Sequence, residues 1–185
     1  CNEDVSNAIL TALMVFQPGT LDKKFTRFLP VALGINFLGQ MSRSEAVIEA
    51  LSSVEHSIGA YAQLVVEVCS YAGTGDVLKV QKYMQLAAKE PANEHEVEQQ
   101  SVALLGVALL SISETTGRGV FMRLVHQVLS YASPALKRVV PVMLAVMGVV
   151  NGNIQITDML FKLAHEEDSE LAFRAILGLG LASAG

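Results

Sequence analysis

The sequence has no tryptophan and few other aromatic residues, with 4 Tyr and 7 Phe among 185 residues. Because 51% of the residues are nonetheless hydrophobic, the core has to consist of aliphatic and small side chains, and disorder is excluded. The sequence also shows no β-hairpin signal, because no Asn-Gly or Asp-Gly pair lies between two stretches of alternating apolar and polar residues. Asn151-Gly152 is an Asn-Gly pair, but it does not lie between two such stretches. The abundance of Ala, Leu, Val, Met, Glu and Lys favours an all-α fold.

No hydrophobic run is long enough to cross a membrane. The longest uncharged apolar run, Val139–Val150, has twelve residues, whereas a membrane-spanning helix needs about 20. We therefore expect this run to be a buried helix of a soluble protein, with no membrane partner. The net charge of −5 argues against nucleic acid as a partner, because binding phosphate requires a clustered basic face.

Cysteine is also scarce, and the two cysteines cannot form a disulfide framework. Cys69 lies inside an apolar stretch and is predicted to behave as a small buried hydrophobe. Both cysteines are compatible with a reducing cytosol or nucleus. The chain begins at Cys1 without an initiator methionine or a targeting segment, so we expect an excerpt from a longer chain.

The sequence does contain a recurring apolar stretch that is rich in small residues. Its five copies span 27–39, 61–73, 101–113, 138–150 and 173–185. Their closing positions are 34, 40, 37 and 35 residues apart, a spacing typical of solenoid repeats. The same place in four copies, five residues before the end, holds Gly34, Ala108, Ala145 and Gly180. We expect these small residues to let neighbouring helices approach closely.

Each copy follows an amphipathic segment, so each repeat is predicted to be a pair of helices. The amphipathic helices should cover the outside, and the helices that are apolar nearly all round should be buried. The prediction is an all-α superhelix or solenoid of about five helical hairpins over residues 1–185, a single repeat domain of about ten helices without strands. A surface loop is expected at 89–99.

Several local signals mark expected helix starts and breaks. Asn2 and Asp76 are expected N-caps, and Ser42 with Glu45 has the spacing of a capping box. Ser133-Pro134 has the residue types of an N-cap followed by a first helical position. Pro30 is expected to kink a helix over 22–38, because proline removes a hydrogen bond and crowds the preceding turn.

No motif in the sequence predicts catalysis. The four histidines are scattered, and none is spaced to share a metal ion with another histidine or a cysteine. Gly73 and Gly75 do not belong to a phosphate loop, because no strand precedes them and no Gly-Lys-Ser/Thr follows. They are better explained as a helix stop with left-handed glycines. We therefore predict that the protein is not an enzyme and has no cofactor.

Acidic residues on three successive outer helices form the candidate binding surface. Stacking should bring them onto one face, with apolar side chains between them. The simple alternative is a solvated acidic face, which any solenoid shows. The candidate docking residues are Glu3, Asp4, Glu45, Glu49, Asp76, Val77 and Val80.

The repeated stretches resemble the proteasome/cyclosome repeat, which occurs in the two large non-ATPase base subunits of the 26S proteasome regulatory particle. The resemblance covers the whole chain and is closest to the smaller of those scaffolds, with CSYAGTGDVLKVQ as its most specific motif. The segments that carry it are RFLPVALGINFLG at 27–39, CSYAGTGDVLKVQ at 69–81, VALLGVAL at 102–109, KRVVPVMLAV at 137–146 and SELAFRAILGLGLASAG at 169–185. Two features depart from the family. Residues 89–99 replace a long acidic insert, and Lys82 stands where an acidic residue can occur. We expect Lys82 to lie near the rim of the docking surface, where its charge would slightly oppose a basic partner.

The resemblance implies a closed toroid of repeats that acts as a non-catalytic scaffold for ubiquitin-dependent degradation. The implied partners are ubiquitin, the ubiquitin-like domains of shuttle receptors, a deubiquitinase, the proteasomal ATPases and other base subunits. The implied location is the cytoplasm and nucleus. The candidate docking residues would then face the basic-rimmed apolar patch of a ubiquitin-like fold. The alternative is a purely structural helical-repeat scaffold or adaptor that does not bind ubiquitin in this segment.

Overall fold

The structure is a computed structural model that describes residues 2–113, 117–150 and 152–184, and these residues form helices and connecting turns without a strand. Two 3₁₀ turns, η1 (Lys24–Arg27) and η2 (Met41–Ser44), precede α3 and α4. The α-helices are α1 (Glu3–Val15), α2 (Pro18–Leu21), α3 (Phe28–Asn36), α4 (Glu45–Ser52), α5 (Ser57–Ser70), α6 (Val77–Ala87), α7 (Glu94–Ser111), α8 (Gly117–Tyr131), α9 (Pro134–Lys137), α10 (Val140–Val150), α11 (Ile154–Leu163) and α12 (Ser169–Ser183). None of the described helices combines the length and hydropathy of a membrane span.

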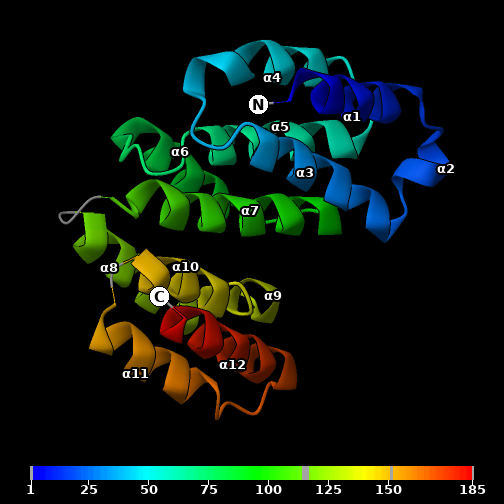
Figure 1. The fold of residues 1–185 in the computed structure, drawn as a ribbon. Coiled ribbons are helices and arrows are strands. Elements are labelled where there is room, and N and C mark those ends of the chain that lie inside the picture. The colour runs from blue at the N-terminus through cyan, green and yellow to red at the C-terminus, as the bar shows by residue number, and fades with distance from the viewer. Residues whose placement is uncertain (1, 114–116, 151, 185) are drawn as a thin grey trace.

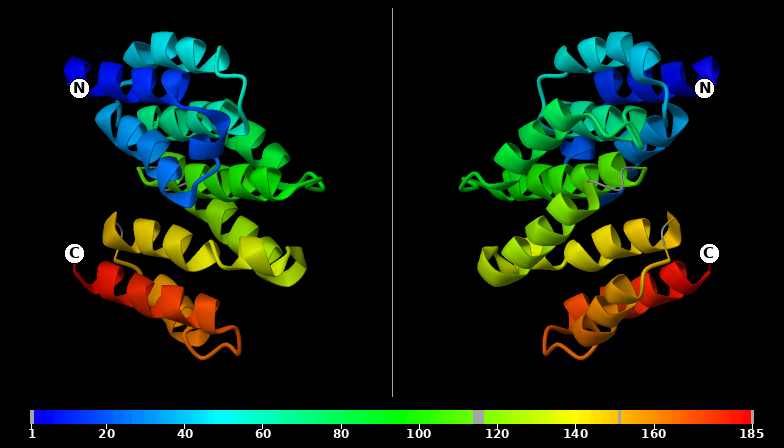
Figure 2. Two further views of the ribbon diagram at one scale, coloured as in Figure 1. Left: turned by 90° about the vertical axis from the view of Figure 1, so that its right-hand side faces the viewer. Right: turned by 90° about the vertical axis from the view of Figure 1, so that its left-hand side faces the viewer.

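The helices form two layers, which confirms the predicted all-α solenoid of hairpins. The inner helices α3, α5, α7, α10 and α12 stack on one another in chain order. The outer helices α1, α4, α6, α8 and α11 each pack against the inner helix of their own repeat (Figures 1 and 2). The five recurring stretches of the sequence therefore correspond to the five inner helices.

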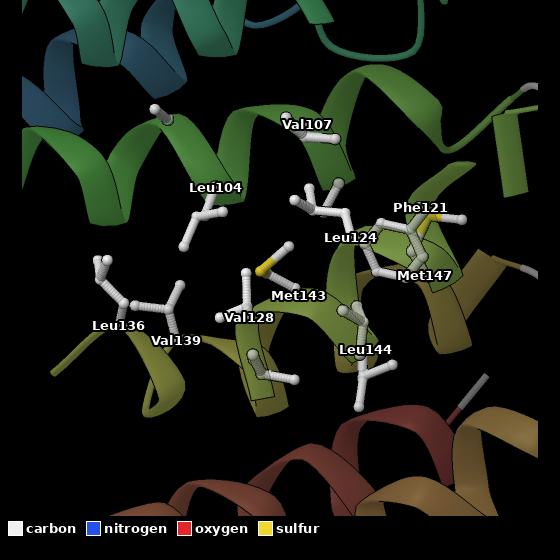
Figure 3. Close-up of a cluster of buried hydrophobic side chains, with 14 of the residues drawn as sticks. Leu104, Val107, Phe121, Leu124, Val128, Leu136, Val139, Met143, Leu144 and Met147 are labelled. Carbon is white, nitrogen blue, oxygen red and sulfur yellow. The ribbon is translucent and has the colours of Figure 1, made fainter. Parts of the chain in front are cut away.

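The core consists of two clusters of aliphatic side chains. The smaller cluster joins α1, α3, α4 and α5. The larger one runs from α5 to α12 and contains the fully buried Met143 and Met147. Figure 3 shows Leu104 and Val107 of α7 above Leu124 and Val128 of α8, with α10 completing the cluster. As the composition predicts, aromatic residues contribute little, since only Phe121 and Tyr83 are large, fully buried rings among the described residues.

Glycines mark the points where helices come closest. A Cβ added to Gly34 would lie 2.9 Å from the Cys69 sulfur, and one added to Gly106 would lie 2.7 Å from Val68 Cγ2. Such distances are shorter than van der Waals contact, so larger side chains would separate the helices. Ala108, which shares the repeat position of Gly34, is fully buried.

Among the described residues Gly180 lies at no such contact, so the expected close approach of another helix of this chain at Gly180 is wrong. A Cβ at Gly180 would meet nothing within 4 Å, whereas one at Gly178 would lie 3.0 Å from Leu160 Cδ2, 3.1 Å from the Pro141 carbonyl oxygen and 3.5 Å from Ala145 Cβ. Two residues along a helix turn the side-chain direction by about 200°, so Gly178 and Gly180 face opposite ways.

Pro30 does not kink a helix, because the expected helix over 22–38 is not continuous. The turn η1 ends at Arg27 and α3 begins at Phe28, which places Pro30 in the first turn of α3. A backbone N–H in the first turn has no partner within the helix, so proline is tolerated there. Pro141 occupies the same kind of position as the second residue of α10.

Two further local predictions are corrected by the structure. Ser42 forms no capping box, because it lies in η2, and α4 begins at Glu45 without a side-chain cap. The loop expected at 89–99 is shorter, since α7 already begins at Glu94. Asn93 accepts a hydrogen bond from the Glu96 N–H, and the Glu96 carboxylate accepts one from the Ala92 N–H, so these residues start the helix early.

The two arginines that share a repeat position both pair with a later inner helix. Arg27 forms an ion pair with Glu98 of α7. Arg138 Nε lies 2.8 Å from Asp168 Oδ2, and its Nη1 lies 3.0 Å from Glu170 Oε2 at the start of α12. These contacts connect the N-terminal ends of the inner helices across repeats.

The difference between Gly178 and Gly180 gives a matched test of the helix contacts. We expect Gly178→Leu to lower the free energy of unfolding by about 1–3 kcal/mol or more, because the added side chain must push α12 away from α10. Gly180→Leu should leave the stability unchanged or raise it by up to about 1 kcal/mol, since leucine is the better helix former. Thermal denaturation of both variants measures the difference, and equal melting temperatures would contradict the assigned contact.

Candidate functional site

A groove on the outer surface runs between α4 and the start of α6, with α5 as its floor. Its open volume is about 380 Å³. The groove is lined by Glu45, Ile48, Glu49 and Ser52 of α4, by Gln63 and Glu67 of α5 with Tyr71 just after it, and by Lys79 of α6. The structure therefore brings two of the predicted docking residues, Glu45 and Glu49, into one concave surface.

The acidic wall of the groove follows from the geometry of α4. Glu45 is the first residue of the helix, where the helix dipole favours a carboxylate. Glu49 lies four residues later, so both side chains project from the same side of the helix. Both residues are exposed, and they give this wall a negative charge that is open to a partner.

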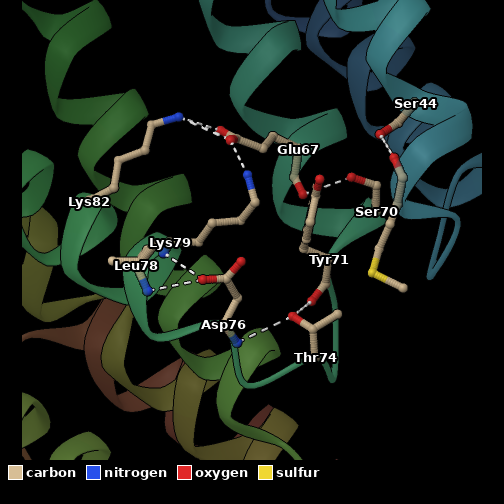
Figure 4. Close-up of polar contacts among 10 residues, drawn as sticks. Ser44, Glu67, Ser70, Tyr71, Thr74, Asp76, Leu78, Lys79 and Lys82 are labelled. Atoms are coloured by element: carbon tan, nitrogen blue, oxygen red, sulfur yellow. Dashed lines mark hydrogen bonds and ion pairs between the residues drawn. The ribbon is translucent and has the colours of Figure 1, made fainter.

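Asp76 lies beside the groove residue Lys79 and, as predicted, is the N-cap of α6, so its carboxylate already accepts hydrogen bonds within the protein. Its Oδ1 accepts hydrogen bonds from the N–H groups of Leu78 at 2.9 Å and Lys79 at 3.2 Å, so Asp76 caps α6 (Figure 4). The preceding Gly73 and Gly75 have φ values of 75° and 66°, which confirms the predicted left-handed stop. Their N–H groups donate to carbonyls at the end of α7, which holds the turn in place.

Two exposed apolar side chains follow Asp76 at the start of α6. Val77 is 64% exposed and Leu78 is 77% exposed. Val80, which the sequence placed in the docking surface, is instead half-buried and packs partly on the core. Leu78 therefore takes the place expected for Val80 on this surface. We call the groove together with Asp76, Val77 and Leu78 the α4–α6 face.

Under this face lies a network of charges around Glu67. Lys79 Nζ lies 2.7 Å from Glu67 Oε1, and Lys82 Nζ lies 2.7 Å from Oε2 (Figure 4). The Lys79 ammonium also lies 3.9 Å from the centre of the Tyr71 ring, a cation–π contact. Burial would raise the pKa of Glu67, but the hydrogen bonds and charges of the two lysines outweigh it and lower the pKa below its ordinary value.

The Glu67 network changes the role expected for Lys82. The sequence placed its charge at the rim of the docking surface, where it would oppose a basic partner. In the structure the ammonium is paired with Glu67, although the side chain is 57% exposed. Its charge is therefore largely balanced within the protein.

Glu3 and Asp4 lie apart from the groove. Both are exposed in the first turn of α1, where Asn2 caps the helix as predicted. The start of α1 is held by Asn36, whose side chain both donates to the Asn2 carbonyl and accepts from the Asn2 N–H. Of the three outer helices expected to share one acidic face, the structure joins α4 and α6 in a groove, and α1 does not line it.

Glu67, Lys79 and Tyr71 were not predicted as site residues from the sequence. Glu67 was overlooked because it belongs to an inner helix, which was expected to be apolar nearly all round. One signal was available, since Glu67 is the only charged residue between Ser57 and Ser70. A lone acid in such a helix predicts a paired partner, and Lys79 and Lys82 are three residues apart on the next helix.

The described residues offer no obvious reactive centre. No group of three or more His, Cys, Asp or Glu side chains in the described ranges could hold a metal ion. Burial raises the pKa of the Cys69 thiol to about 11, so the reactive thiolate is scarce at neutral pH. The α4–α6 face combines exposed acidic and apolar side chains.

Glu67 should make the stability of the protein depend on pH. Because its pKa is lower in the folded protein, its ionised form stabilises the fold above the unfolded pKa, and this contribution is lost as the pH falls through the folded pKa. We expect the stability difference between the parent and Glu67→Gln to be constant near neutral pH and to shrink once the pH falls below 4.5. Urea denaturation across this range measures it, and a difference independent of pH would contradict the network.

Comparison with known proteins gives relatives that align over the whole chain. No protein-family model matches the sequence. The chain is 32% identical to the 26S proteasome regulatory subunit rpn1 of Schizosaccharomyces pombe, over 100% of this chain and 21% of that protein. It is 36% identical to the 26S proteasome non-ATPase regulatory subunit 2 homolog A of Arabidopsis thaliana and to the non-ATPase regulatory subunit 2 of Dictyostelium discoideum, over 100% of this chain and 20% of each relative. The chain therefore belongs to the family of the 26S proteasome regulatory subunits rpn1 and non-ATPase subunit 2.

Proposed function

We propose that this chain is a non-catalytic segment of the scaffold at the base of the proteasome regulatory particle, and that its α4–α6 face binds ubiquitin and the ubiquitin-like domains of shuttle receptors. The scaffold role is supported by the relatives, which are regulatory and non-ATPase subunits of the 26S proteasome. The docking of ubiquitin-like domains is inferred from the resemblance to the proteasome/cyclosome-repeat family. We further propose that the subunit acts in the cytoplasm and nucleus. Its further partners would be a deubiquitinase, the ATPases and other base subunits.

The docking proposal is supported mainly by the side chains of the α4–α6 face, which are acidic and apolar. Glu45 and Glu49, which form no ion pair among the described residues, line the groove. The exposed Val77 and Leu78 lie in the first turn of α6, the helix whose Lys79 also lines it. A ubiquitin-like fold presents an apolar patch rimmed by basic residues. An acidic wall beside exposed aliphatic side chains has the complementary charge and polarity.

The typical energy of an ion pair shows how charged and apolar contacts divide the binding energy. Exposed ion pairs contribute about 0.2–1 kcal/mol each, whereas micromolar affinity requires about 8 kcal/mol. Glu45, Glu49 and Asp76 therefore cannot hold a partner alone. Apolar contacts, among them the burial of Val77 and Leu78, have to supply most of the energy, while the acids set the orientation and the association rate.

Within the face, Asp76 needs a different substitution from the other acids. Replacing it by lysine would remove the N-cap of α6, which costs about 0.5–2 kcal/mol and would mix a folding effect with a binding effect. Asparagine is as good an N-cap and removes only the charge. The Glu45 and Glu49 side chains form no ion pair among the described residues, so reversing their charge breaks no such contact. The helix-dipole energy lost by a lysine at position 45, the first residue of α4, is offset by a lysine at position 49 in its last turn.

We expect the combined variant Glu45→Lys, Glu49→Lys and Asp76→Asn to bind a ubiquitin-like domain at least tenfold more weakly, or about 1.4 kcal/mol. Isothermal titration calorimetry of the full chain with the domain measures the affinity, and the melting temperature should not change. A matched control is Glu166→Lys with Glu167→Lys, which reverses two exposed acids between α11 and α12. If the combined variant binds as tightly as the parent, the acidic wall is only solvated surface.

A further inference from the structure

A second groove lies at the opposite end of α6 from Asp76, between the C-terminal ends of α6 and α8. Met84 and Ala88 line it from the α6 side, and Val128 and Tyr131 line it from the α8 side. Its volume is about 540 Å³, which falls within the roughly 300–1,000 Å³ of sites that bind small ligands or a few side chains. We call it the α6–α8 groove.

The floor of the α6–α8 groove is apolar and belongs to the core. Leu104 of α7, Val128 of α8 and Leu136 of α9 line it, and all three are no more than 7% exposed. Figure 3 shows these three side chains, which come from three different helices, in one cluster. Because the floor is fixed by this packing, the groove is present before any partner binds.

One polar side chain at the groove, that of Gln100, is deeply buried. Gln100, which lines the groove, is 2% exposed, and its amide nitrogen donates to the Lys89 carbonyl at 2.6 Å. Its Oε1 is buried and has no hydrogen-bond partner among the described residues. A buried carbonyl oxygen without a partner costs free energy that a donor from a ligand would recover.

The helix ends add negative potential to the same place. Ala87 is the last residue of α6 and Tyr131 is the last residue of α8, and both line the groove. The C-terminal end of a helix carries a partial negative charge, and neither helix has a basic residue in its last turn to balance it. Lys89 and Glu90 at the mouth have opposite charges and offset each other.

We propose that the α6–α8 groove binds a linear peptide segment of a partner protein in which apolar side chains adjoin an arginine or lysine. The apolar side chains fill the floor formed by Leu104, Val128 and Leu136. The cation lies at the two helix ends, and its N–H groups or those of the peptide backbone donate toward Gln100. The ring of Tyr131, which is 87% exposed, offers a face for a cation–π contact.

This site is separate from the α4–α6 face, because it lies at the C-terminal end of α6 whereas Asp76 caps the N-terminal end. The two grooves share no lining residue. The chain can therefore hold a folded domain at one end of α6 and a linear segment at the other. Failure of either proposal leaves the other standing.

Selection from a random 12-residue peptide library displayed on phage, with the full chain as target, tests the proposal. We expect the selected peptides to combine adjacent apolar residues with arginine or lysine. Ala88→Arg places a cation and a long side chain at the exposed edge of the groove, and it should weaken binding of the selected peptides at least tenfold. Tyr131→Ala should weaken the binding at least threefold.

The matched control is Ala184→Arg, because Ala184 is likewise an exposed residue that follows the last residue of a helix, but it lies outside the groove. It should leave peptide binding unchanged, and all three variants should melt at the temperature of the parent. Selected peptides that are acidic, or that bind Ala88→Arg as tightly as the parent, would overturn the proposal. A selection without enriched peptides would overturn it as well.

Discussion

Close packing between the inner helices is the constraint on which the rest of the structure depends. At Gly34, Gly106 and Gly178 the neighbouring inner helix lies so near that an added Cβ would fall 2.7 to 3.1 Å from one of its atoms. Because there is no room for a Cβ at these glycines, the spacing and rotation of each inner helix relative to the next are closely fixed. The outer helices then take their positions from the inner ones, and their outward faces are left free for partners.

The turn after α5 shows how the inner stack sets the geometry of the α4–α6 face. The Gly73 N–H donates to the Leu109 carbonyl at 2.9 Å, and the Gly75 N–H donates to the Leu110 carbonyl at 3.0 Å. This turn is therefore attached to the end of α7, and the next residue, Asp76, starts α6 at a fixed point. A side chain such as Leu78 is exposed because the backbone beneath it is held, so the face exists without a partner.

The sequence predicted the features that depend on local chemistry and on periodicity. The spacing of the apolar stretches gave the hairpins and the inner layer, and Asn2 and Asp76 were recognised as N-caps from their residue type. Contacts between repeats were harder to predict, because Gly178 and Gly180 differ only in the direction they face in the folded stack. For the same reason the charge of Glu67 was missed, since its lysine partners belong to the next helix.

Methyl NMR of the full chain, labelled at Ile, Leu and Val and titrated with an unlabelled ubiquitin-like domain, shows whether the domain binds at the α4–α6 face or elsewhere on the solenoid. If it binds at this face, the signals of Ile48, Val77 and Leu78 shift, while that of Ile154, which is 78% exposed on α11, does not. Shifts confined to α11 and α12, or no shifts at saturating domain, would contradict binding at this face.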